Sequence, residues 1–190
     1  MTEYKCLNTN EFEFKEYKIV PVRKKDILQI KVWRNKQIDI LRQKELLTTK
    51  KQIEYFKKVV FPDFEAERPK QIIFSFLYKG NLIGYGGLVH INWEDRRGEV
   101  SFLLNPERLK IIMQYKKDFS VFLKFMKHVA YIELNFNRLF TETFDIRRHH
   151  IKVLEKNNFL LEGRMKKHIL INNKFIDSLM HGNLKEYEKF

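Results

Sequence analysis

Residues 71–104 hold three consecutive stretches that are typical of β-strands, and this run constrains the fold more than any other part of the sequence. The stretches are QIIFSFLY, LIGYGGLVHI and GEVSFLL. The turn residues Lys79-Gly80-Asn81 separate the first two, and the polar segment NWEDRRG precedes the third. Apolar stretches rich in β-branched and aromatic residues, bounded by such turns, predict a hairpin followed by a third strand.

Two helices are expected before this run, after a first strand over Tyr17–Arg23. One face of the first helix carries Ile27, Ile30 and Trp33. The second helix opens with Thr49 and Gln52 at the spacing of a capping box. Its apolar stripe consists of Ile53, Phe56, Val59 and Val60.

After the central strands, Asn105 and Pro106 suit the N-cap and first position of a short helix. The elements that follow are a helix over Ser120–Leu134, a strand over Arg138–Phe144, a helix over Ile146–Lys156 capped by Asp145, and two strands around Asn172-Asn173. One face of the long helix carries Phe122, Phe125, Met126, Val129 and Ala130. This order predicts an α+β fold around a mixed sheet.

The composition predicts one globular domain over residues 1–190. Hydrophobic residues make up 44% of the chain and aromatic residues 14%, which is sufficient for a substantial core. The single cysteine, Cys6, excludes a disulfide within the chain, and neither a signal pattern nor a membrane-length apolar run is evident. We therefore expect a cytoplasmic protein without a membrane partner. The net charge of +13 favours an anionic partner: nucleic acid, a membrane surface or phosphate-bearing small molecules.

The element order and five local motifs together resemble the GNAT superfamily of acetyl-CoA-dependent N-acetyltransferases. The motifs are WRN (Trp33–Asn35), LIGYGGLVHINW (Leu82–Trp93), GEVSFLLNPE (Gly98–Glu107), LNFNRLFTET (Leu134–Thr143) and VLEKNNFLLEGRMKKHILINNKFIDSLMHG (Val153–Gly182). Within the superfamily, the likeness is to the nucleotide-sugar N-acetyltransferase of the pseudaminic acid pathway and to ribosomal-protein N-acetyltransferases. The resemblance implies a mixed, mostly antiparallel sheet of about seven strands, splayed in the middle and flanked by helices.

The resemblance also implies where acetyl-CoA, the acyl donor, would bind. Strands Glu99–Leu104 and Arg138–Phe144 would splay apart, and the pantetheine arm would bind to their free edges, including the backbone of Leu103 and Leu104. The pyrophosphate would lie at the N-terminus of the helix that begins near Ser120. No metal is expected, because no histidine or cysteine spacing suits a metal site.

The phosphate loop departs from the family pattern, which has two small residues after a Gln or Arg. Here Gln114 keeps the polar position, while Lys117 and Phe119 replace the small residues, and Asp118 sits where an N-cap would compete with a phosphate. Lysine side chains could replace the missing backbone contacts as point charges. The candidates are Lys110, Lys116 and Lys117. The alternative, a loop that has lost tight CoA binding, stays open.

Acetyl transfer to an amine needs a group that removes a proton, and Glu142 is the first candidate. Strand alternation places it on the same face as Phe140 and Phe144. By resemblance, a glutamate at this position acts through a water molecule; an ion pair with a neighbouring arginine is the equally weighted alternative. His149 and His150 are further candidates because imidazole titrates near neutrality. Relatives that use a tyrosine to protonate the departing thiolate have it at the position of Leu154.

The predicted helix over 146–156 begins with Arg147, Arg148, His149 and His150, although helix N-termini favour acids. Arg147 matches an asparagine that contacts pantetheine in the family. One interpretation is that this basic turn faces the cofactor or a phosphorylated acceptor; the other is a solvated turn.

Arg34 in WRN matches an arginine that meets nucleotide phosphates in the sugar-modifying relatives, and a guanidinium suits that role through its bidentate fork. A structural ion pair is the alternative. Gln52 and Trp93 are further candidates for the acceptor pocket.

The leading hypothesis is an acetyl-CoA-dependent N-acetyltransferase that acts on a primary amine of a nucleotide-linked amino sugar. A protein N-terminus or another small-molecule amine is the alternative acceptor. A hypothesis of a different class is a non-catalytic domain of the same fold that binds nucleic acid or ribosomes. The sequence has no nucleic-acid recognition motif or basic arm, which disfavours nucleic acid. A homodimer is compatible with the sequence, which does not fix the oligomeric state.

Overall fold

The computed structural model describes residues 3–189, which form an eight-stranded sheet flanked by helices. The strand order is β1-β2-β3-β4-β5-β6-β8-β7. The strands are β1 (Phe12–Phe14), β2 (Tyr17–Pro21), β3 (Ile72–Tyr78), β4 (Asn81–Asn92), β5 (Arg97–Leu104), β6 (Arg138–Phe144), β7 (Leu160–Ile171) and β8 (Lys174–Leu184). Only the β5–β6 pair is parallel. The α+β class and the mixed, mostly antiparallel sheet are confirmed, with β1 as the strand that the sequence did not predict.

Both predicted hairpin turns are present. Lys79 and Gly80 between β3 and β4 have positive φ angles of 48° and 77°. Asn172 and Asn173 between β7 and β8 have φ angles of 48° and 61°. Glycine and asparagine tolerate this left-handed region better than other residues, so the local chemistry of the turns fixes the register of the hairpins.

The helices are α1 (Ile27–Lys36), α2 (Thr49–Tyr55), α3 (Pro106–Leu109), α4 (Ile112–His128) and α5 (Arg148–Lys156). Wider π-helical turns, Phe56–Val60 and Val129–Glu133, continue α2 and α4. The predicted apolar faces of α1 and of the long helix are buried. In the second helix, however, Ile53 and Val59 are exposed, and the N-cap is Thr48, whose side chain accepts from the backbone of Lys51.

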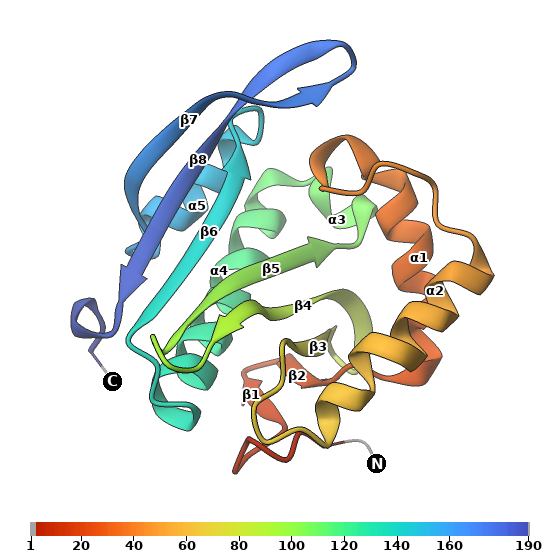
Figure 1. Cartoon of the computed structure of the whole chain (residues 1–190), viewed down its shortest axis with the longest axis vertical. Coiled ribbons are helices and arrows are strands. Elements are labelled where there is room, and N and C mark those ends of the chain that lie inside the picture. The colour runs from red at the N-terminus through yellow and green to blue at the C-terminus, as the bar shows by residue number, and fades with distance from the viewer. Residues whose placement is uncertain (1–2, 190) are drawn as a thin grey trace.

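The helices cover the sheet from two sides. In Figure 1, α4 lies behind the central strands, while α1 and α2 lie together at one side. Gly86 on β4 allows α4 to approach closely, because a Cβ atom there would lie 2.9 Å from the Phe122 ring. Arg34 on α1 donates to the Tyr85 hydroxyl, so α1 packs near the neighbouring β4 position.

The long helix begins eight residues earlier than predicted, at Ile112 instead of near Ser120. Tyr115, Asp118 and Phe119 are buried and join the helix to the core. The Asp118 carboxylate accepts hydrogen bonds from Tyr17 (2.8 Å) and from Arg108 (2.7 and 3.0 Å). Asp118 is therefore neutralised inside the helix by distant partners, and its predicted position as a competing N-cap is wrong.

The basic helix, α5, begins at Arg148, two residues later than predicted, with Arg147 at the N-cap. Asp145, the predicted cap, instead accepts a hydrogen bond of 2.5 Å from Arg164 on β7. Since Asp145 caps no helix here, the basic first turn has no acidic residue to balance it.

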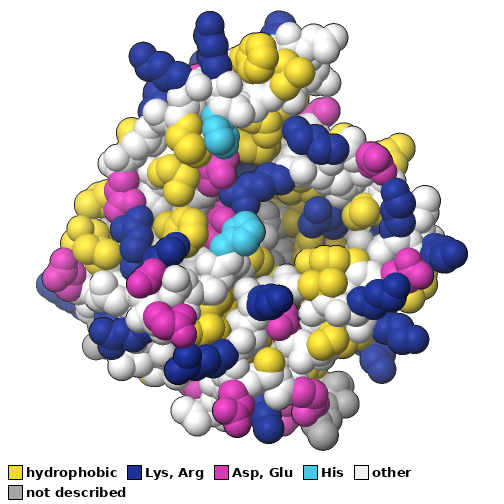
Figure 2. Space-filling view, viewed as in Figure 1, with side chains coloured by type: hydrophobic (Ala, Val, Ile, Leu, Met, Phe, Trp, Pro, Cys, Tyr) yellow, Lys and Arg dark blue, Asp and Glu magenta, His cyan; other side chains and the backbone are white. Residues whose placement is uncertain are grey.

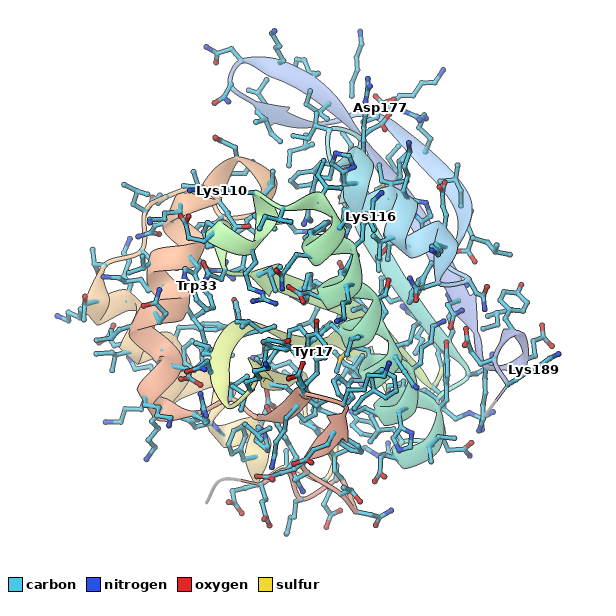
Figure 3. All side chains as sticks on the ribbon, turned by 180° about the vertical axis from the view of Figure 1, so that it is seen from behind. Tyr17, Trp33, Lys110, Lys116, Asp177 and Lys189 are labelled. Carbon is cyan, nitrogen blue, oxygen red and sulfur yellow. The ribbon has the colours of Figure 1, made fainter. Side chains whose placement is uncertain are left out.

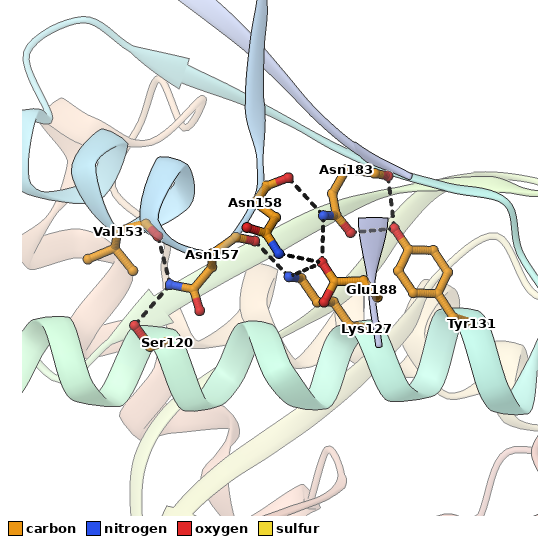
Figure 4. Close-up of polar contacts among 8 residues, drawn as sticks. All are labelled: Ser120, Lys127, Tyr131, Val153, Asn157, Asn158, Asn183 and Glu188. Atoms are coloured by element: carbon orange, nitrogen blue, oxygen red, sulfur yellow. Dashed lines mark hydrogen bonds and ion pairs between the residues drawn. The ribbon is translucent and has the colours of Figure 1, made fainter. Parts of the chain in front are cut away.

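The C-terminal segment is tied to α4 by a buried polar network (Figure 4). Glu188 accepts hydrogen bonds from Lys127 (2.5 Å) and Asn183 (2.8 Å). Lys127 also donates to the backbone carbonyl of Asn157, at 2.6 Å. The network joins the C-terminal residues to the end of α5. No helix in the described part of the chain is long and apolar enough to span a membrane.

Candidate active site

Strands β5 and β6 pair over only three residues and then part. The register joins Arg97–Glu99 of β5 to Arg138–Phe140 of β6 and stops there. Figure 1 shows the two strands close at one end and diverging at the other, with α4 behind the gap. Beyond Glu99, the edges of β5 and β6 that face each other carry no strand pairing, including the edge at Leu103 and Leu104. The splay that the resemblance implied is therefore present.

A cavity of about 160 Å³ lies between the parted strands. The predicted residues Glu142, Arg147, His150 and Arg34 all line it. The other lining residues are Ile40, Leu41, Arg42, Val89, Glu99, Val100, Ser101, Phe102, Thr141, Thr143 and Phe144. The fold thus brings Arg34 of α1 together with Glu142, Arg147 and His150, which lie close to one another in the segment that contains β6 and α5. We call this cavity the central cleft.

Two carboxylates at the central cleft share one arginine. Arg42, from the segment between α1 and α2, donates to Glu99 at 2.7 and 3.2 Å and to Glu142 at 2.9 Å. His90 lies 2.7 Å from Glu99, and His168 lies 3.6 Å from Glu142. Figure 2 shows two histidine side chains, with acidic and basic side chains between them, beside a hollow in this face. The side chains of Glu99 and Glu142 are only 8% and 17% exposed.

Glu99 and Arg42 are the site residues that sequence reasoning missed. Glu99 was identified only as the start of a strand, although alternation along GEVSFLL places it on the face opposite to Val100 and Phe102. That alternation was the available signal. Nothing local marked Arg42, which lies 57 residues from Glu99 and 100 residues from Glu142 in the sequence. Glu142 meets an arginine, as the alternative interpretation expected, and it also lines the cleft.

Arg34 extends the site on the side of α1. Its guanidinium donates to the Tyr85 hydroxyl at 2.6 Å and to the Gln43 amide oxygen at 3.1 Å. Among residues 3–189, no carboxylate forms an ion pair with it, so the predicted structural ion pair is wrong. Arg34 also lines two cavities beside the cleft, of about 300 and 250 Å³. A partly buried guanidinium held by neutral groups keeps its charge available to an anion.

Gln52 and Trp93, the other predicted acceptor contacts, have different surroundings. Gln52 is buried and donates to the carbonyl of Ile27, and it lines the smaller cavity beside Arg34. Trp93 donates to the carbonyl of Pro69 and packs edge-on against Phe136, away from the cleft. Trp93 is therefore a packing residue.

On the other side of the central cleft, Arg147 and the buried His150 line the cavity, and His150 contacts the buried Tyr115 behind it. The Tyr115 hydroxyl lies 2.6 Å from His150 Nδ1, and Arg147 lies 3.2 Å from the same nitrogen. Burial holds the pKa of His150 well below its ordinary value, and Arg147 and His181 lower it further. Burial also lowers the pKa of Arg147 and raises that of Tyr115 to about 12. The neighbouring His149 is exposed.

Lysines gather where α4 begins. Figure 3, which views the molecule from behind, shows Lys116 on α4 beside α5. A cavity of about 390 Å³ lies here, and its lining consists of Met113, Lys116, Lys117, Ser120, Lys152, Val153 and Lys156. Gln114 occupies the same first turns of α4, whereas Lys110 is paired with Glu107 at 2.5 Å on α3. Ser120 lies within the helix and accepts from Asn157, so its predicted place at a helix N-terminus is wrong.

This arrangement fits acetyl-CoA as the acyl donor. The free edges of β5 and β6 offer backbone hydrogen bonds to an extended chain, and four lysines of the 390 Å³ cavity offer charge to phosphates. No group of three or more possible metal ligands occurs in the part of the chain that the structure describes. The site therefore combines a slot for an extended thioester, two carboxylates and several hydrogen-bond donors.

Comparison with known proteins agrees with this geometry. A family model described as "Acetyltransferase (GNAT) domain" matches residues 19–180. A solved structure of spermidine N-acetyltransferase from Vibrio cholerae, in complex with CoA and spermine, is 16% identical, with a TM-score of 0.79. The alignment covers 91% of this chain and 98% of that chain. A dodecameric structure of spermidine N-acetyltransferase from the same organism is 17% identical, covers 91% and 96% of the two chains and has a TM-score of 0.75.

At these identities the structural likeness shows the fold. The solved structures named above are spermidine N-acetyltransferases, and they give no support to the nucleotide-sugar or ribosomal-protein branches that the sequence motifs suggested. The matching family model confirms the superfamily, and the choice of acceptor depends on the site itself.

Proposed function

This chain belongs to the GNAT acetyltransferase domain family, and from that premise we propose that it transfers an acetyl group from acetyl-CoA to a primary amine whose carrier bears a negatively charged group. A nucleotide-linked amino sugar is the leading acceptor. The observation that carries the proposal is the central cleft, where β5 and β6 part beside two carboxylates. The cleft gives the thioester and the amine one place to meet.

The donor end of the proposal assigns acetyl-CoA to the β5–β6 slot. The backbone edges beyond Glu99 hydrogen-bond the pantetheine arm, as an added strand would. The lysines at 116, 117, 152 and 156 hold the phosphates at the other end. These point charges take the place of the glycine-loop amides that the sequence lacks.

The proposed base is the pair of carboxylates. An alkylammonium has a pKa near 10 and must lose a proton before attack, and a positioned base contributes about 10²–10⁴-fold. Glu99 and Glu142 already hold a cationic N–H group, the guanidinium of Arg42, at the cleft. The acceptor amine takes that place when Arg42 moves aside. Glu142 or Glu99 then accepts the proton, and His168 or His90 passes it to solvent.

The preference for an anionic acceptor follows from the charge of the cleft. Three arginines (34, 42 and 147) and two glutamates (99 and 142) line it, so the cations are in excess by one. Arg34 has no carboxylate partner among residues 3–189 and lies between the cleft and two further cavities. A phosphate of the acceptor therefore binds Arg34 while the amine reaches Glu142.

A polyamine is the second candidate acceptor. The pairing of Glu99 and Glu142 with one guanidinium favours it, since two carboxylates suit a cationic amine. Solved structures with a similar fold include spermidine N-acetyltransferases. A free protein N-terminus remains a further alternative that no particular contact favours.

Acetyl transfer should be measured as release of the CoA thiol with three acceptors: a nucleoside diphosphate amino sugar, spermidine and a peptide with a free N-terminus. We expect the nucleotide sugar to give the highest kcat/KM, by about tenfold or more over spermidine, since each 1.4 kcal/mol of contact energy is tenfold. A higher kcat/KM for spermidine would make a polyamine, and not the nucleotide sugar, the acceptor. If none of the three acceptors is acetylated and acetyl-CoA does not bind, the transferase proposal is refuted.

A further inference from the structure

The hydrogen bonds around His150 determine which ring nitrogen carries its proton. Arg147 lies 3.2 Å from Nδ1, and a guanidinium can only donate, so Nδ1 is an acceptor. The Tyr115 hydroxyl, 2.6 Å from the same nitrogen, therefore also donates to it. A neutral imidazole accepts at one nitrogen and donates at the other, so His150 carries its proton on Nε2.

His150 is also uncharged. The residue is 6% exposed, its ring stacks on Phe119 at 4.1 Å, and the groups that face it are Tyr115 on α4, Arg147 on α5 and His181 on β8. Burial, with smaller contributions from Arg147 and His181, holds its pKa well below the ordinary value. The ring is therefore a fixed neutral donor, and its role as a general base, one of the sequence-based hypotheses, loses support.

The Nε2 atom has no hydrogen-bond partner among residues 3–189. This atom also keeps some solvent exposure, whereas both ring nitrogens of His181 are fully buried without a hydrogen-bond partner. His150 lines the central cleft, and the free N–H of an otherwise buried ring is directed to open space. We take that space to be the cleft, where the thioester would lie.

We propose that His150 is a catalytic residue that donates a hydrogen bond from Nε2 to the sulfur of the departing CoA thiolate, and that Tyr115 is the positioning residue that fixes its tautomer. This proposal rests on the proposed acetyl transfer. Leu154, where many relatives have a tyrosine, lies one turn further along α5 and is fully buried. Residues four apart share a helix face, so His150 supplies a donor on the face where Leu154 has none.

The step balances without a further reactant. The amine nitrogen forms a bond to the acyl carbon, and the C–S bond breaks with its electron pair going to sulfur. The acceptor ammonium loses two protons in total, of which one ends on sulfur and the other in solvent. His150 keeps its own proton throughout and stabilises the thiolate by a charge-assisted hydrogen bond until sulfur is protonated.

Two matched substitutions separate the donor from the rest of the ring. In His150→Gln the amide nitrogen can replace Nε2, whereas in His150→Asn it can replace only Nδ1. We expect His150→Gln to keep kcat within a few-fold of the wild type. His150→Asn should lose about 10²-fold in kcat with little change in KM, the effect of removing one donor to a developing anion. Melting temperatures of both variants establish that they are folded.

Titration of bound CoA gives a readout that does not depend on turnover. Thiolate absorbance of the protein–CoA complex reports the pKa of the bound thiol, which a hydrogen bond to the charged form lowers. The wild type and His150→Gln should show a lower thiol pKa than His150→Asn. Equal thiol pKa values in all three complexes would overturn the proposal. Failure of the wild type to bind CoA would instead refute the proposed function on which it rests.

The role of Tyr115 is tested by the tautomer itself. In ¹⁵N-histidine NMR spectra of the free protein, His150 should show the Nε2–H tautomer from pH 5.5 to 8.5. Tyr115→Phe keeps the buried ring but removes the closer donor to Nδ1, and it should admit a fraction of the Nδ1–H tautomer together with a smaller loss of kcat. An Nδ1–H tautomer in the wild type would overturn both assignments.

Discussion

Removing Glu188 should destabilise the protein markedly, because Lys127 would be left buried without its counter-charge. The side chains of Lys127 and Glu188 are only 9% and 14% exposed, and the two charged atoms lie 2.5 Å apart. Burial already lowers the pKa of Lys127, so the cation is kept by its partner. Breaking a buried pair by removing one member costs about 3–5 kcal/mol. We take the lower end, about 3 kcal/mol, since Lys127 would keep its hydrogen bond to the carbonyl of Asn157.

For a domain of this size each kcal/mol changes the melting temperature by about 2–4 °C, so Glu188→Ala should lower it by about 6–12 °C. Glu188→Gln keeps an acceptor for Asn183 and should lose less. Lys127→Met combined with Glu188→Leu should recover most of the stability, because replacing both charges by apolar groups is often neutral. Lys189→Ala, next in the chain and exposed, is the matched control and should leave the melting temperature unchanged.

The measurement is thermal unfolding by circular dichroism at pH 7.5, at low and high salt. A buried pair is screened less than a surface pair, so the differences should persist at high salt. A shift below about 2 °C for Glu188→Ala, less than 1 kcal/mol by the same conversion, would refute this account. The C-terminal segment would then contribute little to the stability of α4 and α5.

Three further predictions concern the site. Arg34→Ala should raise KM for a nucleotide-sugar acceptor much more than KM for acetyl-CoA. Arg34→Lys should not restore the low KM for the acceptor, because a lysine lacks the bidentate fork. Equal effects on both KM values, with a lowered melting temperature, would make Arg34 structural. Acetyl-CoA at about 100 times its Kd should raise the melting temperature by several degrees. Lys116→Glu combined with Lys117→Glu should reduce that shift, whereas the exposed control Lys5→Glu should not. An unchanged shift in the double variant would refute the proposed contact of these lysines with the phosphates. The stabilising contribution of neutral His150 should be fully present above pH 6.5 and lost as the pH falls, because the unfolded chain then binds a proton that the buried ring does not bind. The free energy of unfolding, measured from pH 7.5 to 5, should therefore fall less steeply in His150→Gln than in the wild type. An identical slope would contradict the burial effect.

Much of the fold could be predicted because its signals are local. The alternation and turns of residues 71–104 gave the central strands, and Asn172-Asn173 marked the last hairpin. The helical spacing of Ile27, Ile30 and Trp33 identified a buried face. Helix ends were predicted less well. The helix α4 begins at Ile112 and continues through Asp118, because Tyr17 and Arg108 neutralise that carboxylate. No local sequence pattern indicates these two partners.

The candidate site divides in the same way. Strand alternation placed Glu142 on one face with Phe140 and Phe144, and the basic turn was recognised as unusual from the sequence alone. The sequence did not indicate that Arg147 and His150 would turn inward to Tyr115 while His149 faces solvent. It did not connect Glu99 to Arg42 or His90 either.

The sequence by itself determined most of the elements and their order, the apolar faces of α1 and α4 and the chemistry of the hairpin turns, because each depends on residues within a few positions of one another. Only the tertiary structure decided that β5 and β6 separate after Glu99 and that Arg42 joins Glu99 to Glu142. These features depend on burial and on hydrogen bonds between residues 57 and 100 positions apart, whose electrostatic strength is set by the packing around them.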